Sequence, residues 1–359
     1  MRVLTVTLSW YLLCAVSTMA APAWAFDFVS GQFFTTAGFL EPDYPVRTVR
    51  RYSATGQYVE SLSLPSGVGT PDAAHGLSFG PDGLLYVVSI DYSGTEVVAL
   101  HRTGVVARKY SAPQGYGGSA ASGKIVFSAD GNFFVTTGLS ILRFSSTLPS
   151  GVAIYSDSEI EALAALPSGN LLVLTRFSLK EITASGTVVR TISPSVTLYD
   201  AISLAYDAQS DSIYVGMIQG DSVIRIAAAD GVLLNQATVP SPFDIRITKD
   251  RSVVVTSRYG NPKFHDITLQ SLGVFGGVPQ LFIAEVPSAL PEIEPCSLDV
   301  DGNAKIDYAT DGLLILRAML GFSDAALVAN ATGSGPARRD TAVKIRLFLR
   351  DSCGLQLPW

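Results

Sequence analysis

The sequence is poor in charged residues, histidines and cysteines. Charged residues make up 16% of the 359 positions, and there are only three histidines and three cysteines. The 25 lysines and arginines are outnumbered by 31 acidic residues, so no basic surface is expected to follow a phosphate backbone. We therefore expect no nucleic-acid partner. The 48% of hydrophobic residues excludes general disorder and predicts a packed core.

Residues 1–25 have the features of a signal peptide. Arg2 precedes an apolar stretch, and Ala23-Trp24-Ala25 fits the small-residue cleavage pattern, which places the mature start at Phe26. Serines and threonines interrupt the apolar stretch, so we expect no integral membrane anchor, although an uncleaved anchor is the alternative. The sequence thus predicts a secreted protein, periplasmic or extracellular.

Cleavage would leave two cysteines, Cys296 and Cys353. In an oxidising compartment such a pair predicts a disulfide, which would contribute roughly 3–4 kcal/mol to the stability of a small domain. Two free buried thiols are the alternative.

Residues 26–286 contain a repeat of about 40 residues, the length that a four-stranded propeller blade requires. Each copy joins strand-forming runs through a tight turn. The copies begin at His75 ("HGLSFGPDGLLYVV"), Gly123 ("GKIVFSADGNFFVTT"), Glu161 ("EALAALPSGNLLVLT"), Asp200 and, less regularly, Phe243. The chain is therefore predicted to be mainly β.

The ends of this region supply the remaining strands. Residues 28–65 lack a clear first strand, and the strand at 280–286 has no partner in its own unit. We therefore predict a six-bladed β-propeller in which the late strand closes the ring against the N-terminal blade; seven blades are the alternative. The repeat resembles NHL-type and streptogramin-lyase-like propellers and, more loosely, gluconolactonase-like ones.

This resemblance implies that any chemistry would lie at the mouth of the central channel. His75, Glu161, Asp200 and Asp244 hold similar positions in their repeats and could together bind a divalent metal. That set would make the protein a metal-dependent lyase or lactonase. Enzymes of the streptogramin-lyase type are expected to use more than one histidine, however, and only one is placed at the mouth. We therefore favour a non-enzymatic propeller.

Residues 287–295 form a Pro- and Glu-containing linker, and the composition changes at residue 296. A cluster of oxygen donors follows, with the spacing of a calcium loop. The donors are Asp299, Asp301, Asn303, Lys305 through its backbone carbonyl, Asp307 and Asp311. A run of leucines at helical spacing begins directly after Asp311.

The segment 296–359 resembles a dockerin, a relative of EF-hand proteins, and the resemblance implies calcium as cofactor. Ala304 stands where the family has glycine, and Asp311 comes one residue late. The second half keeps a helix, expected to be capped by Asp340, but Arg338 and Arg339 should repel a second calcium.

The sequence as a whole predicts a secreted, monomeric binding protein. Its propeller would recognise an extracellular protein or glycan, and the small α-helical dockerin-like domain would attach or stabilise it.

Overall fold

The computed structural model describes residues 28–36, 48–64, 74–91, 93–102, 104, 106–115, 123–145, 148–198, 200–276, 279–288, 296–322, 324–333, 335–353 and 355. The predicted signal peptide and most of the predicted linker lie outside these residues. The chain divides into two compact units, residues 1–290 and 291–359, and each is described by itself.

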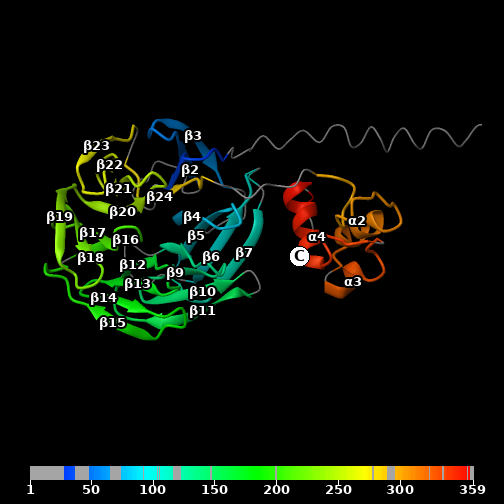
Figure 1. Cartoon of the computed structure of the whole chain (residues 1–359), viewed down its shortest axis with the longest axis horizontal. Coiled ribbons are helices and arrows are strands. Elements are labelled where there is room, and N and C mark those ends of the chain that lie inside the picture. The colour runs from blue at the N-terminus through cyan, green and yellow to red at the C-terminus, as the bar shows by residue number, and fades with distance from the viewer. Residues whose placement is uncertain are drawn as a thin grey trace, which may run out of the picture. The chain divides into compact units, whose positions relative to one another are not determined.

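The larger unit consists of strands arranged as four-stranded antiparallel meanders (Figure 1). The strands of each meander are given from the innermost outward. The first meander contains β24 (Phe282–Glu285), β1 (Phe33–Thr36), β2 (Thr48–Tyr52) and β3 (Tyr58–Ser63), and the second contains β4 (Ala74–Phe79), β5 (Leu85–Asp91), β6 (Gly94–Leu100) and β7 (Val106–Ala112). The third contains β8 (Ile125–Phe127), β9 (Phe133–Thr136), β10 (Ser140–Ser145) and β11 (Leu148–Ser156).

The other three meanders follow the same plan. The fourth contains β12 (Ile160–Ala165), β13 (Leu171–Thr175), β14 (Leu179–Ile182) and β15 (Val188–Ile192), and the fifth contains β16 (Ala201–Asp207), β17 (Ser212–Met217), β18 (Ser222–Ala227) and β19 (Leu233–Thr238). The sixth contains β20 (Pro242–Ile247), β21 (Val253–Ser257), β22 (Lys263–His265) and β23 (Ser271–Val274). The described strands thus form a β-propeller.

The innermost strands close into a ring. Around it, β24 lies beside β4, then β8, β12, β16 and β20 follow, and β20 lies beside β24 again. The ring is closed by antiparallel pairing of β24 with β1, which joins the end of the propeller to its beginning and confirms the partner expected for the late strand. The second and third meanders also touch at their outer edges, where Ser111 of β7 pairs in parallel with Ser150 of β11.

The hydrophobic core is divided among the spaces between neighbouring meanders. In the described chain one buried cluster fills each such space, and aromatic rings are prominent in the one between the last meander and the first. This arrangement explains the continuous apolar runs in the sequence: all five residues of β13 are buried because neighbouring sheets cover both of its faces. The outermost strand β19 instead alternates between half-buried and exposed residues.

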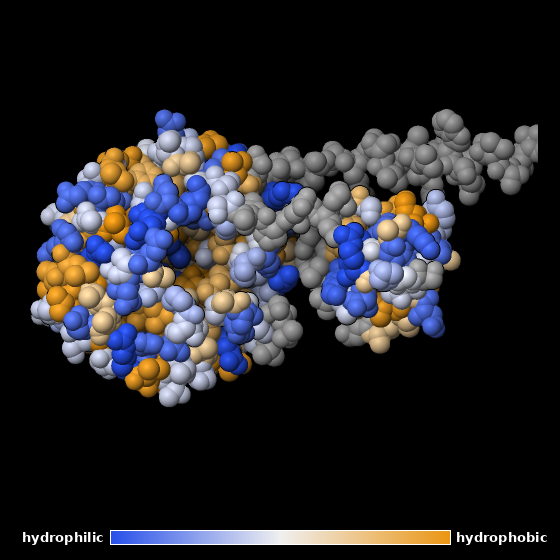
Figure 2. All heavy atoms as spheres, in the orientation of Figure 1, coloured by the Kyte–Doolittle hydropathy of each residue, from blue (hydrophilic) through white to orange (hydrophobic). Residues whose placement is uncertain are grey.

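The turns between the first and second strands have the geometry that the sequence predicted. Gly131 and Gly169 have φ angles of +81° and +85°, which side-chain-bearing residues rarely adopt. On the face in view, hydrophobic residues form small groups separated by hydrophilic ones (Figure 2).

The smaller unit is helical. It contains α2 (Asp311–Met319), α3 (Asp324–Val328), α4 (Ala342–Leu347) and a π-helical turn, η2 (Phe348–Ser352). Its core includes Val300, Leu314, Leu327 and Ile345, and the disulfide Cys296–Cys353 joins its two ends. The cap of α4 differs from the prediction: the side chain of Thr341 accepts the bond from Lys344 N (3.4 Å), whereas Asp340 pairs with the Lys344 ammonium. None of the described helices is long and apolar enough to cross a membrane.

Candidate functional site

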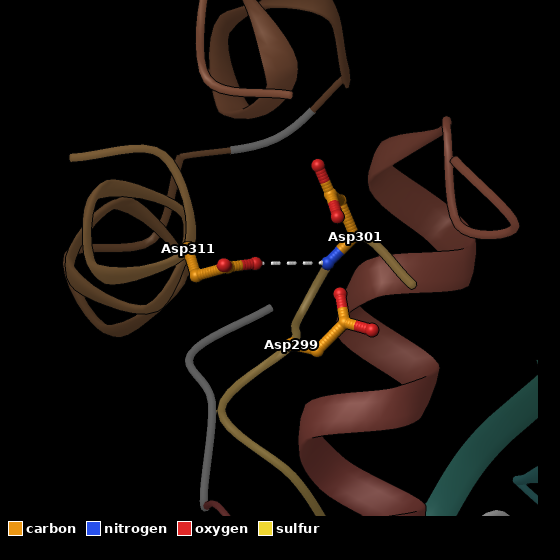
Figure 3. Close-up of side chains that lie close together, drawn as sticks. All are labelled: Asp299, Asp301 and Asp311. Atoms are coloured by element: carbon orange, nitrogen blue, oxygen red, sulfur yellow. Dashed lines mark hydrogen bonds between the residues drawn. The ribbon is translucent and has the colours of Figure 1, made fainter. Parts of the chain in front are cut away.

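Three carboxylates of the smaller unit meet at one point. Oxygen atoms of Asp299, Asp301 and Asp311 all lie within 4.8 Å of one another, and the side chains approach from the loop 299–311 and from the first residue of α2 (Figure 3). Although Asp311 comes one position late in the sequence, the fold brings its carboxylate to the loop. There Oδ1 accepts bonds from the backbone N–H groups of Val300 (2.7 Å) and Asp301 (3.2 Å).

The cluster is largely buried. Asp301 is 0% and Asp311 2% exposed. These carboxylates accept hydrogen bonds from backbone N–H groups and from one side-chain amide. Gly333 N, for example, donates to Asp301 Oδ2 at 2.6 Å. No lysine or arginine among the described residues forms an ion pair with the three carboxylates. Because burying like charges close together is costly without compensation, a hard divalent cation fits this oxygen donor set.

The other predicted donors are placed differently. Asn303 lies at the edge of the cluster, where its amide nitrogen donates to Asp301 Oδ2 at 3.1 Å and its Oδ1 accepts from Lys305 N at 2.8 Å. The carboxylate of Asp307 is exposed and accepts from Ala309 N at 2.9 Å, so it does not belong to the group of three. Ala304 has φ +65°, the left-handed geometry expected where the dockerin family has glycine.

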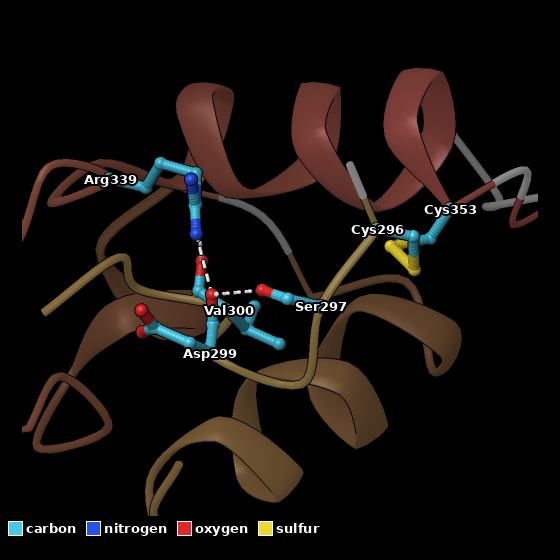
Figure 4. The surroundings of a disulfide bond; sticks show 6 residues. All are labelled: Cys296, Ser297, Asp299, Val300, Arg339 and Cys353. Carbon is cyan, nitrogen blue, oxygen red and sulfur yellow. Dashed lines mark hydrogen bonds between the residues drawn. A yellow bond between two sulfur atoms is a disulfide. The ribbon is translucent and has the colours of Figure 1, made fainter. Parts of the chain in front are cut away.

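Arg339 supports the loop by bonding to its backbone carbonyls. Its Nε donates to Val300 O at 2.8 Å and its Nη2 to Asp299 O at 2.5 Å (Figure 4). Its own backbone N–H donates to Asp301 O at 2.8 Å, and the guanidinium lies 3.8 Å from the centre of the Phe348 ring. The sequence predicted only that this arginine would repel a second calcium; its role in holding the first loop was missed, because a run of two arginines gives no sign of a carbonyl partner forty residues away.

The centre of the propeller contains an ion pair. Lys124, directly before β8, donates from Nζ to Asp244 Oδ1 on β20 at 2.7 Å and to Phe243 O at 3.1 Å. The lysine and aspartate side chains are only 5% and 3% exposed. Burial lowers the pKa of Lys124, and the charge of Asp244 opposes this shift. The other oxygen of Asp244 accepts from Ile283 N at 3.2 Å, so this carboxylate is occupied on both sides.

The remaining described channel candidates have different surroundings. Asp200 lies 3.5 Å from the guanidinium of Arg176, and Glu161 is buried on β12. His75 lies on β4, but its side chain is outside the described part of the structure. Among the described side chains, Glu161, Asp200 and Asp244 do not form a group that could bind a metal; the group that does is in the smaller unit.

No family model matches the chain, and no curated protein matches it. Solved structures do. They include a protein of unknown function from Bacteroides caccae (13% identity, TM-score 0.50, 72% of this chain and 99% of that one), a nidogen/laminin complex (13%, 0.53, 72% and 99%) and a streptogramin B lyase (12%, 0.50, 72% and 88%). At these identities the similarity shows the propeller fold alone.

Proposed function

We propose that the protein is a secreted, non-enzymatic binding protein. In this proposal the propeller presents a recognition surface, and the smaller unit is a calcium-stabilised, dockerin-like attachment module. The observation that carries the proposal is the contrast between two sets of carboxylates: Asp244 pairs with Lys124, whereas Asp301 and Asp311 are buried together and form no ion pair with a described lysine or arginine.

Calcium is the proposed cofactor because of the ligand chemistry. Calcium prefers six to eight oxygen ligands, and carboxylates and carbonyls supply them. Asp299, Asp301 and Asp311 would provide the charged ligands, with Asn303 and the Lys305 carbonyl completing the loop. The disulfide Cys296–Cys353 supports the extracellular assignment, since such bonds persist in oxidising compartments.

The surface of α2 supports an attachment role. Its buried side is formed by Asp311, Leu314 and Ala318. Leu316 and Met319 of the helix and Leu320 directly after it are 54%, 55% and 65% exposed. An apolar stripe on a helix next to a metal loop is suited to bind a partner protein, because such a surface gains by leaving water.

The metal-dependent lyase or lactonase is the second candidate, suggested by the channel position of Glu161, Asp200 and Asp244. It would require Asp244 to exchange Lys124 for a metal, and Asp200 to leave Arg176. The ion pairs therefore favour the binding protein.

Calcium titration by calorimetry tests the proposal on the mature full chain. We expect one site in the wild type, lost in Asp301→Ala and retained in Asp340→Ala, an exposed carboxylate of the same unit. Absence of binding in the wild type would refute the calcium module. A second site that survives Asp301→Ala would indicate a metal in the channel and support the enzyme.

A further inference from the structure

Three successive meanders share one detail at the start of their innermost strands. The residue before each strand has a positive φ and accepts, through its carbonyl, the backbone N–H of the residue after the second strand. The pairs are Arg176 N to Glu159 O (3.1 Å), Ile218 N to Asp200 O (3.1 Å) and Arg258 N to Ser241 O (2.9 Å). The loops between second and third strands therefore lie at the same end of their sheets as the starts of the innermost strands.

Contacts between neighbours place these loops on one face of the propeller. Ile160 N, at the start of β12, donates to Gly138 O of the preceding loop (2.7 Å), and Ser241 N donates to Asp221 Oδ1 (2.8 Å). Arg176 spans the next boundary, with its guanidinium 2.8 Å from Glu159 and 3.5 Å from Asp200. The fourth, fifth and sixth meanders thus present their loops side by side.

Two of these loops carry an exposed aromatic ring directly after an arginine. Phe177 in the β13–β14 loop is 70% exposed, and Tyr259 in the β21–β22 loop is 72% exposed. Each ring is backed by the preceding guanidinium, Arg176 at 5.5 Å and Arg258 at 5.4 Å from the ring centre. A cation beside an aromatic ring attracts it electrostatically, and most of the surface of each ring is still exposed.

The surroundings of Tyr259 can form further hydrogen bonds. Arg258 forms no ion pair with the described residues, and the half-buried amide of Asn261 makes no hydrogen bond with them. Thr175 and Ser178 flank Phe177 and share a 2.8 Å hydrogen bond. Between the two rings, the fifth meander presents Gln219 and Asp221, both exposed.

This pattern differs from that of a protein-binding surface. Protein interfaces centre on a contiguous apolar patch, whereas here two single rings stand apart among donors and acceptors. A pyranose ring has an apolar C–H face and a rim of hydroxyl groups, so it packs on an aromatic ring while its hydroxyls bond to guanidinium, amide and carboxylate groups. Two rings on the fourth and sixth meanders, with the fifth between them, fit a chain of sugars better than a single sugar.

We infer that this face binds an oligosaccharide, with Phe177 and Tyr259 as two stacking platforms and Arg258 and Asn261 as hydroxyl ligands. The inference rests on the proposed binding function and specifies its ligand class. It uses none of the four channel candidates and none of the metal-loop residues.

The inference can be tested by calorimetry of the mature full chain with a panel of neutral hexasaccharides. The panel contains β-glucan, xylan, mannan and chitin fragments and the matching disaccharides. We expect one hexasaccharide to bind, and its disaccharide to bind at least about tenfold more weakly because it reaches one ring only. Phe177→Ala and Tyr259→Ala should each weaken hexasaccharide binding roughly 3- to 10-fold, and the double variant should bind it no better than the disaccharide. Tyr259→Phe should retain most of the affinity.

Tyr58→Ala is the matched control, because this ring is 51% exposed on the outermost strand β3. It should leave binding unchanged. Failure of every hexasaccharide to bind the wild type, or wild-type affinity in the double variant, overturns the inference. The calcium titration tests the smaller unit independently of the oligosaccharide panel. If calcium binds but no oligosaccharide does, the proposed binding function would still hold, but the ligand would be of another class. Cleavage of the bound hexasaccharide would instead refute the non-enzymatic function.

Discussion

Lys124 and Asp244 are 120 residues apart in the sequence, yet Lys124 Nζ lies 2.7 Å from Asp244 Oδ1. Lys124 directly precedes β8 and Asp244 lies on β20, the third and sixth innermost strands around the ring, so the pair joins opposite sides of the propeller. The ammonium also lies 4.8 Å from the centre of the Phe282 ring on β24. One buried cation thus ties together three of the innermost strands.

Removal of the lysine is expected to destabilise the propeller strongly. Lys124→Met would leave buried Asp244 with only Arg246, whose Nε lies 3.7 Å away and whose side chain is 26% exposed, and breaking a buried pair typically costs about 3–5 kcal/mol of unfolding free energy. In the double variant Lys124→Met/Asp244→Asn both charges of the pair are removed, and the loss should be clearly smaller than the sum of the two single losses. Urea denaturation of the full chain measures both. Arg190→Met, which removes a partly exposed pair with Glu181, should cost no more than about 1 kcal/mol. Additive effects at Lys124 and Asp244 would contradict the prediction.

The propeller could be predicted from the sequence because its signals are local. Turn glycines such as Gly131 and Gly169, and the apolar strands beside them, recur along the chain, and each needs only its neighbours to be interpreted. The central ion pair could not be predicted in this way. Lys124 and Asp244 hold the same position in their repeats, each seven residues before the positive-φ turn residue, Gly131 or Arg251. Only the closed ring shows that equal positions in the third and sixth repeats meet.

In the smaller unit, too, the local features could be predicted from the sequence and the long-range contact could not. The spacing of Asp299 and Asp301 and the helix after Asp311 lie within one short segment, and the structure brings the three carboxylates together. The part played by Arg339 depends on a contact across the unit, with the carbonyls of Asp299 and Val300, and was not visible in the sequence. A guanidinium satisfies loop carbonyls as readily as it repels a cation, and composition alone does not distinguish the two.

Ala304 is expected to be a weak point of the metal loop. Its φ of +65° is unfavourable for a residue with a Cβ, so Ala304→Gly should raise the unfolding free energy of the smaller unit by about 1 kcal/mol. Ala309→Gly is the control, because Ala309 does not have a positive φ and gains nothing from glycine. Thermal unfolding with and without calcium would measure both variants. Equal or lower stability of Ala304→Gly would show that the loop relaxes this strain by another route.

The disulfide is expected to stabilise the smaller unit only. Cys296 and Cys353 are 57 residues apart, and replacing both by serine should lower the unfolding free energy of that unit by about 2–5 kcal/mol. The propeller transition should keep its midpoint, because neither cysteine belongs to the larger unit. Scanning calorimetry of the wild type with a thiol reductant should reproduce the behaviour of the double variant. An unchanged transition of the smaller unit under reductant would contradict the prediction.

Acid is expected to weaken the propeller turns. Asp130 accepts hydrogen bonds from Ser128 Oγ (2.5 Å) and Asn132 N (3.1 Å), and Asp250 does the same with Thr248 and Ser252. The hydroxyl bonds, followed by backbone bonds, hold the pKa of both carboxyls below the ordinary value of 3.8. A lowered folded-state pKa means that the unfolded chain binds protons more readily. The stabilisation by these carboxylates is therefore complete above pH 3.8 and is lost as the pH falls through the lower folded-state values.

The double variant Asp130→Asn/Asp250→Asn tests this pH dependence. It should be less stable than the wild type at pH 6, and the difference should shrink steadily below pH 3.8, because acid then protonates the wild-type carboxylates. Urea midpoints measured between pH 7 and pH 2.5 give the comparison. Ser168→Ala is the matched control: Ser168 occupies the corresponding turn of another meander and accepts from Asn170 N at 3.3 Å without a charge, so its effect should not change with pH. A difference between the aspartate variant and the wild type that is as large at pH 3 as at pH 6 would mean that the charges of these two carboxylates do not stabilise the turns.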